Sequence, residues 1–327
     1  MKARTVSLIG LDRLSGSLAL ALRKAGLGLG ISGADAARPV AEKALELGIL
    51  DSIDSNQADA AAAADILILN LPLNELEETL ARVGPAVQPH ALVLDLAPLK
   101  GPGLKWAAQY LDHGHYVGVT PVVAAGVLED GRGDIVSASA DLFRDGILCL
   151  MPSPAADPQA VETAVNLGRL IGATPFFLDA QEYDGLMHGV ETLPGLLAAA
   201  LFRASSLAPG WRDMLRFAGR PFAQAAAGLK RPDLAALALN DRLATLRWLD
   251  ALLAEVQTVR RWVEQGDAER LELLLADVAQ QHGRWLASRQ ANDWSEDPGM
   301  PDVSNMSFGN QLFGGTWRRK RDGDKKS

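Results

Sequence analysis

The sequence predicts an α/β fold, with an N-terminal Rossmann-type doubly wound sheet followed by an all-helical C-terminal domain. In the first half, short apolar runs alternate with helical segments, which is typical of a parallel sheet with helices on both faces. From residue 183 to about residue 290 the pattern is helical, rich in leucine and alanine and poor in β-branched runs. A chain of 327 residues has room for two domains.

The boundaries follow from these patterns. We predict a dinucleotide-binding domain at 1–179, a helical substrate and dimerisation domain at 180–295, and a disordered basic tail at 296–327. In the first domain each strand is a short apolar run and the helices lie between such runs. The predicted strands include Val6–Ile9, Ile66–Leu71, Ala91–Leu96, Ile147–Leu150 and Thr174–Leu178, and the helices Asn74–Val83 and Ala160–Ile171.

The first 35 residues predict a dinucleotide site. The run Val6–Ile9 leads into Gly10, a helix follows through Ala25, and a second short strand ends at Asp35. A glycine turn that opens a helix offers amide groups to a diphosphate, and an acid about 20 residues later holds the ribose 2′-hydroxyl, which favours NAD over NADP. The residues expected to bind the cofactor are Gly10, Leu11, Asp12, Arg13, Leu14 and Asp35.

The glycine turn departs from the usual fingerprint, because Asp12 and Ser15 stand where its second and third glycines belong. Ser15 is small enough for a helix to pack closely on a strand. A carboxylate at Asp12 would repel a diphosphate by about 4 kcal/mol at ~4 Å and an effective dielectric near 20, and Arg13 can offset part of that. The alternative is that Asp12 caps the helix and no cofactor binds.

The composition limits the partners. A net charge of −8 without a long basic stripe in the folded part argues against nucleic acid. The single cysteine, Cys149, lies in an apolar run, which excludes a disulfide framework and indicates a core residue in a reducing, cytoplasmic setting. We expect no signal peptide, no membrane span and no metal site.

The second half predicts packing surfaces. Leu234–Glu264 forms one long amphipathic stretch, with Trp248 and Trp262 on a face of leucine and alanine. Such a stripe is typical of a core or of a dimer surface. Its apolar residues exceed what a single bundle needs, so we expect a homodimer formed through the helical domain.

Several short motifs follow one another between about residue 5 and residue 290. They are Gly10–Ala19, Gly33–Asp35, Asn70–Leu73, Asp95–Lys100, Gly118–Pro121, Asp141–Phe143, Tyr183–Asp184, Leu193–Pro194 and Arg212–Arg216. In this order they resemble the prephenate/arogenate dehydrogenase family of tyrosine biosynthesis. The resemblance implies NAD(P)-dependent oxidative decarboxylation of a cyclohexadienyl compound by a homodimer, with a small carboxylated ring as substrate and Leu71 and Pro72 beside the cofactor.

The resemblance also implies a set of catalytic positions. In this family a histidine takes the proton of the ring hydroxyl, a second histidine and a serine position substrate and cofactor, and an arginine holds a carboxylate. In this sequence Thr120 stands at the position of the first histidine, Pro98 at that of the serine and Thr192 at that of the second histidine. The arginine is kept as Arg216. A threonine hydroxyl does not titrate usefully near neutral pH, and loss of an acid–base group typically costs about 10²–10⁴ in rate.

His188 is a possible replacement for the missing base. It precedes Thr192 by four residues, so a helix through both would place them one turn apart on one face. The alternative is a histidine packed against a neighbouring element. The candidate catalytic residues are therefore His188, Thr120, Thr192 and Arg216, the alternative for the arginine being a solvated helix face paired with Asp213.

Three functions fit these residues. The first is an active dehydrogenase of the prephenate/arogenate type with a displaced base. The second is a catalytically impaired paralogue that binds a carboxylated ligand without turnover. The third is a dehydrogenase of another hydroxy acid, because a fold does not fix its chemistry.

Overall fold

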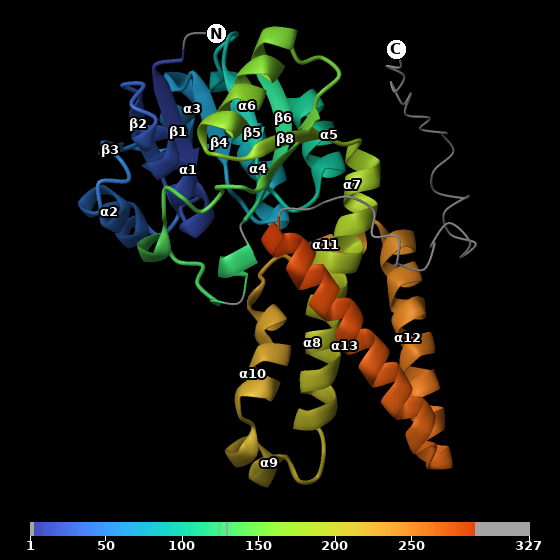
Figure 1. Ribbon diagram of the computed structural model, residues 1–327. Helices are drawn as coiled ribbons and strands as arrows, with labels where there is room; N and C mark the ends of the chain where they lie inside the picture. Colours follow the sequence, from blue (N-terminus) through green and yellow to red (C-terminus); the bar gives the residue numbers. More distant parts are fainter. Residues whose placement is uncertain (1–2, 124, 129, 292–327) are drawn as a thin grey trace, which may run out of the picture.

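The computed structural model describes residues 3–123, 125–128 and 130–291 (Figure 1). A sheet region comes first and a region of long helices follows, which confirms the predicted fold class. The last strand ends at Phe177 and the first helix of the second region begins at Ala180. The predicted tail at 296–327 lies outside the described residues.

Eight strands form one sheet in the order β3-β2-β1-β4-β5-β6-β7-β8. All neighbours are parallel except β6 and β7, which corrects the expectation of a purely parallel sheet. Between these two strands the described chain contains only short helical turns, with no crossover helix to carry it back over the sheet, so β7 starts at the end where β6 stops. The strands are β1 (Thr5–Ile9), β2 (Gly30–Ala34), β3 (Ser52–Ile53), β4 (Ile66–Leu69), β5 (Leu92–Asp95), β6 (His115–Val122), β7 (Ile147–Pro152) and β8 (Thr174–Phe177).

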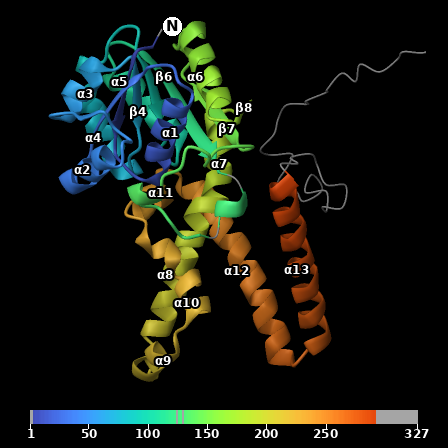
Figure 2. The same ribbon diagram turned by 60° about the vertical axis from the view of Figure 1, so that its left-hand side comes forward.

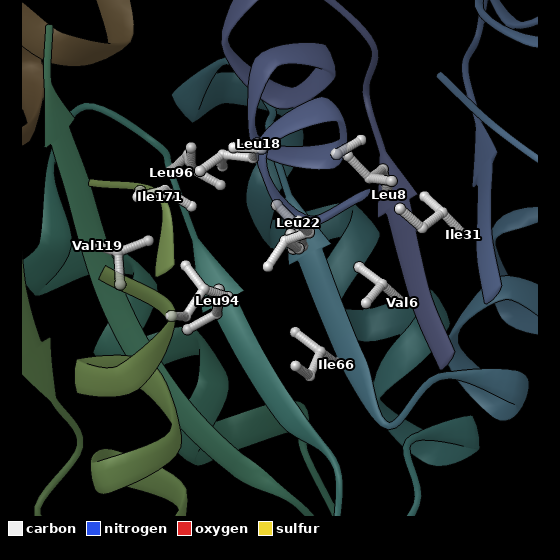
Figure 3. Packing of buried hydrophobic residues seen from close by; sticks show 14 of the residues in the cluster. Val6, Leu8, Leu18, Leu22, Ile31, Ile66, Leu94, Leu96, Val119 and Ile171 are labelled. Atoms are coloured by element: carbon white, nitrogen blue, oxygen red, sulfur yellow. The ribbon is translucent and has the colours of Figure 1, made fainter. Parts of the chain in front are cut away.

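Helices cover both faces of the sheet. Side chains of a strand point alternately to opposite faces, so Ile66 and Ile68 enter one core while Leu67 and Leu69 enter the other. Figure 3 shows the first core, where Leu18 and Leu22 of α1 lie over the central strands. The helices of the sheet region are α1 (Arg13–Lys24), α2 (Arg38–Glu46), α3 (Gln57–Ala63), α4 (Leu73–Val83), α5 (Lys100–Tyr110) and α6 (Pro158–Leu170), with short turns η1 (Gly84–Ala86), η2 (Ala125–Val127) and η3 (Ile135–Ser137).

The second region projects away from the sheet (Figures 1 and 2). The long helices α12 and α13 pack side by side, and α12 ends at Gly266, whose φ of +63° is the left-handed conformation that commonly terminates a helix. The elements are α7 (Ala180–Met187), the π-helical turn η4 (His188–Thr192), α8 (Leu193–Ser206), α9 (Trp211–Phe217), α10 (Arg220–Ala225), η5 (Ala227–Lys230), α11 (Leu234–Asn240), α12 (Arg242–Gln265) and α13 (Ala268–Ala291).

The expected single stretch Leu234–Glu264 is two helices. The chain leaves the helical conformation at Asp241, whose carboxylate accepts a hydrogen bond from the Ala244 backbone N–H at 2.9 Å and so begins α12. Aspartate is a strong N-cap and a poor residue for a helix interior, so it starts a new helix here.

One continuous helix, Ala180–Ser206, is long and apolar enough to cross a bilayer by length and composition. Core helices of soluble proteins pass the same test, and this one packs against its neighbours: a Cβ on Gly189 would lie 2.7 Å from the ring of Trp248, and one on Gly195 2.7 Å from Leu234. The helix is thus weak support for a membrane location.

Candidate functional site

The candidate site begins where β1 and β4 end side by side. Here the strand order changes direction, which is where open α/β sheets bind their ligands. Gly10 follows β1 with a φ of +87°, and a Cβ at this position would lie 2.0 Å from the carbonyl oxygen of Asn70. Only glycine fits this close approach. It brings the turn against the segment after β4 that contains Leu71 and Pro72, the two residues expected beside the cofactor.

Asp12 caps α1. Its Oδ1 accepts hydrogen bonds from the backbone N–H groups of Leu14 at 2.7 Å and Ser15 at 3.0 Å, and the Ser15 hydroxyl accepts one from the Asp12 N–H at 3.0 Å. This reciprocal pair is a capping box. Of the two roles open to Asp12 in the sequence, the structure therefore shows the cap.

The remaining donors of the turn are also engaged. Asp35 accepts a hydrogen bond from the Leu11 N–H at 2.7 Å and another from the Ala37 N–H at 2.7 Å. The Arg13 N–H donates to the carbonyl of Gly133 at 3.0 Å. The Arg13 guanidinium pairs with Asp130 at 2.7 Å, so its charge is already matched by another carboxylate. The turn as arranged does not fit the diphosphate of a dinucleotide, because its N–H groups already have acceptors.

On the other side of the switch point two hydroxyl groups meet. Thr120 of β6 and Tyr183 of α7 lie with Oγ1 and Oη 2.7 Å apart. Burial raises the pKa of Tyr183 well above its ordinary value. Both groups can donate or accept hydrogen bonds with a ligand hydroxyl, and neither can take its proton near neutral pH.

A buried ammonium lies beneath this hydroxyl pair. Lys100 is fully buried, and its Nζ donates to the backbone carbonyls of Asp95 at 3.0 Å, Val119 at 2.8 Å and Ala97. Nζ also lies 5.8 Å from the centre of the Tyr183 ring. Burial lowers the pKa of Lys100 to about 8. The lysine ties the end of β5 to β6 and so holds Thr120 in place.

Cys149 lies opposite Thr120 on the neighbouring strand β7 and is buried, as expected for a core residue. Burial raises the pKa of its thiol, so the thiolate that a nucleophile needs is disfavoured.

Asp184 joins the helical region to the sheet region. Its carboxylate accepts hydrogen bonds from the backbone N–H groups of Lys100 at 2.6 Å and Gly101 at 2.8 Å, which begin α5. It caps that helix from across the domain boundary. Burial raises the pKa of Asp184 to about 6.

The raised pKa of Asp184 predicts a pH dependence. Between pH 4 and 6 the folded chain holds a proton that the unfolded chain has lost, so this stabilisation is complete below the unfolded value and disappears as the pH rises through about 6. From pH 4.5 to 7 we expect the wild-type free energy of unfolding to fall by about 1–2 kcal/mol relative to Asp184→Asn. Urea unfolding of both proteins across this range measures the difference, and parallel curves would contradict the prediction.

His188 and Thr192 lie in the π-helical turn η4, a wider turn than the α-helix expected for them. Both are buried. His188 Nδ1 lies 3.3 Å from the Thr245 hydroxyl, whereas His188 Nε2 and Thr192 Oγ1 have no hydrogen-bond partner within the described part of the chain. Burial lowers the pKa of His188, which favours the neutral imidazole that a base requires.

Arg216 does not join these residues. It lies on α9, at the end of the helical region away from the sheet (Figures 1 and 2), with its side chain 69% exposed and 3.7 Å from Asp213. The expectation that Arg216 reaches the site of its own chain is therefore wrong. The motif order correctly placed the arginine on a helix, but the long α8 carries that helix away from the sheet.

An open depression of about 450 Å³ lies between α5 and α7, beside Asp184. Three carboxylates and a single cation line it, so its charge does not suit an anionic ring. The charged lining residues are Lys105, Asp179, Asp184 and Asp241.

Sequence reasoning missed the roles of Lys100 and Asp184 and the contact between Thr120 and Tyr183. Lys100 directly follows the apolar run Ala97–Leu99, which was a signal of a buried charge. Asp12, with Ser15 three residues later, was a signal of a capping box. No local pattern indicates the other contacts, because they join residues 63 to 84 positions apart.

Comparison with known proteins agrees with this architecture. Residues 18–175 match the family model "Prephenate dehydrogenase, nucleotide-binding domain", a match that begins after the glycine turn. Prephenate dehydrogenase of Bacillus subtilis is 28% identical over 82% of this chain and 72% of its own length. Cyclohexadienyl dehydrogenase of Zymomonas mobilis is 23% identical over 86% and 90%. The structure of A. aeolicus prephenate dehydrogenase with hydroxyphenyl propionate and NAD+ superimposes with a TM-score of 0.74 at 19% identity, covering 86% of this chain and 98% of that one.

Proposed function

Because this chain belongs to the prephenate and arogenate dehydrogenase family of NAD-dependent oxidoreductases, we propose that it binds a carboxylated six-membered ring of the prephenate class and turns it over slowly. The pair Thr120–Tyr183 carries the proposal, because Thr120 stands in β6 at the position where the family's proton acceptor is expected, and Tyr183 reaches it from α7. The pair can hold a ring hydroxyl by hydrogen bonds, but hydride departure also needs a base for the hydroxyl proton.

Of the two dinucleotides, NAD is the one we propose, because the Asp35 carboxylate at the end of β2 would repel a 2′-phosphate. The N–H groups of the turn that would hold the diphosphate of this cofactor already have acceptors. The chain's own residues supply the hydroxyl pair Thr120–Tyr183 and the buried Lys100, which holds β6 in place through the carbonyl of Val119.

A homodimer through the helical region is part of the proposal. Many large apolar side chains of this region are exposed, among them Leu207 at 69%, Phe217 at 84% and Leu243 at 81%. Apolar surface of this extent is typical of a surface that another subunit covers. Arg216 lies between the exposed Leu215 and Phe217, so in such a dimer it would face the second copy. The proposed location is the cytoplasm, whose reducing conditions suit a chain with a single cysteine.

A displaced base is a second candidate, favoured by the buried His188 Nε2 without a partner. In that case the protein would be an active dehydrogenase, and the neutral imidazole of His188 would take the proton of the ring hydroxyl.

The experiment that tests the proposal combines binding and turnover. Thermal unfolding is measured with prephenate, with arogenate and with cyclohexane carboxylate, which lacks the ring hydroxyl, and NADH formation is followed separately. We expect prephenate or arogenate to raise the melting temperature, with turnover about 10²–10⁴ below that of a relative with histidine at the position of Thr120.

Tyr183→Phe removes one hydroxyl of the pair at constant ring size and should reduce the shift produced by prephenate, but not that produced by cyclohexane carboxylate. If neither prephenate nor arogenate shifts the melting temperature of the wild type, the proposal is contradicted. Turnover equal to that of the relative, and lost in His188→Ala, would instead establish the second candidate.

A further inference from the structure

We infer that Asp12 closes the phosphate-binding turn of this chain, so that the wild-type protein binds NAD only weakly. The inference concerns the turn alone and does not depend on the ring compound proposed above. It rests on the donors at the start of α1, on the segment packed along that helix, and on the space beside it.

The first observation is the occupancy of the donors. A dinucleotide diphosphate binds the N-terminal N–H groups of this helix in a Rossmann domain. Here the Leu14 and Ser15 N–H groups donate to Asp12 Oδ1, and the Asp12 N–H donates to Ser15. The carboxylate therefore takes the hydrogen bonds and the position that the diphosphate needs, and it carries a negative charge of its own.

The second observation is a strap, residues 130–141, that runs along α1. At the start of the helix Asp130 pairs with the Arg13 guanidinium at 2.7 Å. Further along, Ser17 accepts a hydrogen bond from the Ser139 N–H at 2.9 Å. Lys24 pairs with Asp141 at 2.7 Å near the other end. A Cβ on Gly16 would lie 2.5 Å from Ile135, so the strap packs directly on the helix.

The third observation is the space that remains. The depression beside Asp12 and Arg13 measures about 230 Å³, and much of its lining comes from Val123, Val127, Leu128, Arg132 and Gly133. Sites for small molecules typically measure about 300–1,000 Å³. The space beside the turn is therefore small for a dinucleotide, and the carboxylate stands where the diphosphate would enter.

Calorimetric titration of the full-length protein with NAD tests the inference. We expect Asp12→Gly to bind NAD about tenfold or more tightly than the wild type, because it frees the two N–H groups that the side chain now occupies. Glycine is itself a tolerated N-cap, so this variant should fold. Asp12→Asn keeps a side-chain oxygen on the same N–H groups and should bind NAD as weakly as the wild type.

Two controls isolate the diphosphate. Adenosine, which has no phosphate, should give the same result with the wild type and with Asp12→Gly. Asp157→Gly removes another aspartate cap, the one that accepts from the Gln159 N–H at the start of α6, and should leave NAD binding unchanged.

Equal NAD affinity of the wild type and Asp12→Gly, whether tight or undetectable, would overturn the inference. Tight binding by Asp12→Asn would overturn it as well, because charge and not occupancy would then close the turn. Failure of the proposed function is seen separately, since the melting-temperature shift with prephenate is measured without NAD.

Discussion

Thr120→His, introduced together with Asp12→Gly, is expected to raise the rate of NADH formation from prephenate by about 10²–10⁴ over Asp12→Gly alone. The reason is that Thr120 and Tyr183 offer hydrogen bonds but no base that titrates near neutral pH, because burial raises the pKa of Tyr183 well above its ordinary value. An imidazole at the end of β6 would supply a group whose ordinary pKa lies near neutrality. Thr120 is only half-buried, so the larger side chain of histidine can extend toward the solvent-exposed side.

Steady-state rates of the two variants, with prephenate and NAD at saturation, measure this effect. Thr120→Val in the same background is the matched control, since it keeps the size of threonine without the hydroxyl and should not raise the rate. The gain should follow a titration near the pKa of the new imidazole, losing activity at low pH where the ring is protonated. An unchanged rate in a folded Thr120→His variant would show that the missing base is not what limits this chain.

Lys100→Met is expected to lower the free energy of unfolding by about 3–5 kcal/mol. The substitution removes the donor shared by the carbonyls of Asp95, Ala97 and Val119, and leaves the buried Asp95 carboxyl without a nearby cation. Buried polar groups that lose their partner cost the full desolvation penalty. Methionine keeps most of the volume of lysine, so the loss reports the charge and hydrogen bonds and not a cavity.

Urea unfolding of Lys100→Met and of Lys105→Met measures this prediction. Lys105 lies on the same helix, five residues further on, and is exposed, so its substitution should change the free energy of unfolding by less than about 0.5 kcal/mol. Similar losses in the two variants would contradict the structural role assigned to Lys100.

The sheet region was predictable because its signals are local. Each buried strand is a short apolar run, and alternation along the run sends side chains into the two cores. The antiparallel β7 was not predictable from the run Ile147–Leu150 itself, because its direction depends on the absence of a crossover helix between β6 and β7. The break at Asp241 was missed because periodicity continues across it.

The site was less predictable than the fold. The sequence placed Thr120, Tyr183 and His188 near the relevant motifs but gave no contact between them. Arg216 was misplaced, because its position depends on the length and direction of α8 and not on its motif.

By itself the sequence determined that this chain carries a Rossmann-type sheet, a helical second half and hydroxyls where a base is expected, because strand and helix periodicities and residue identities are properties of short segments. Only the tertiary structure decided that Asp12 caps α1, that residues 130–141 lie along that helix, and that Lys100 and Asp184 join the sheet to α5 and α7. The physical reason is that a hydrogen-bonding group is satisfied by whichever partner the folded chain brings within reach, and these partners are distant in sequence.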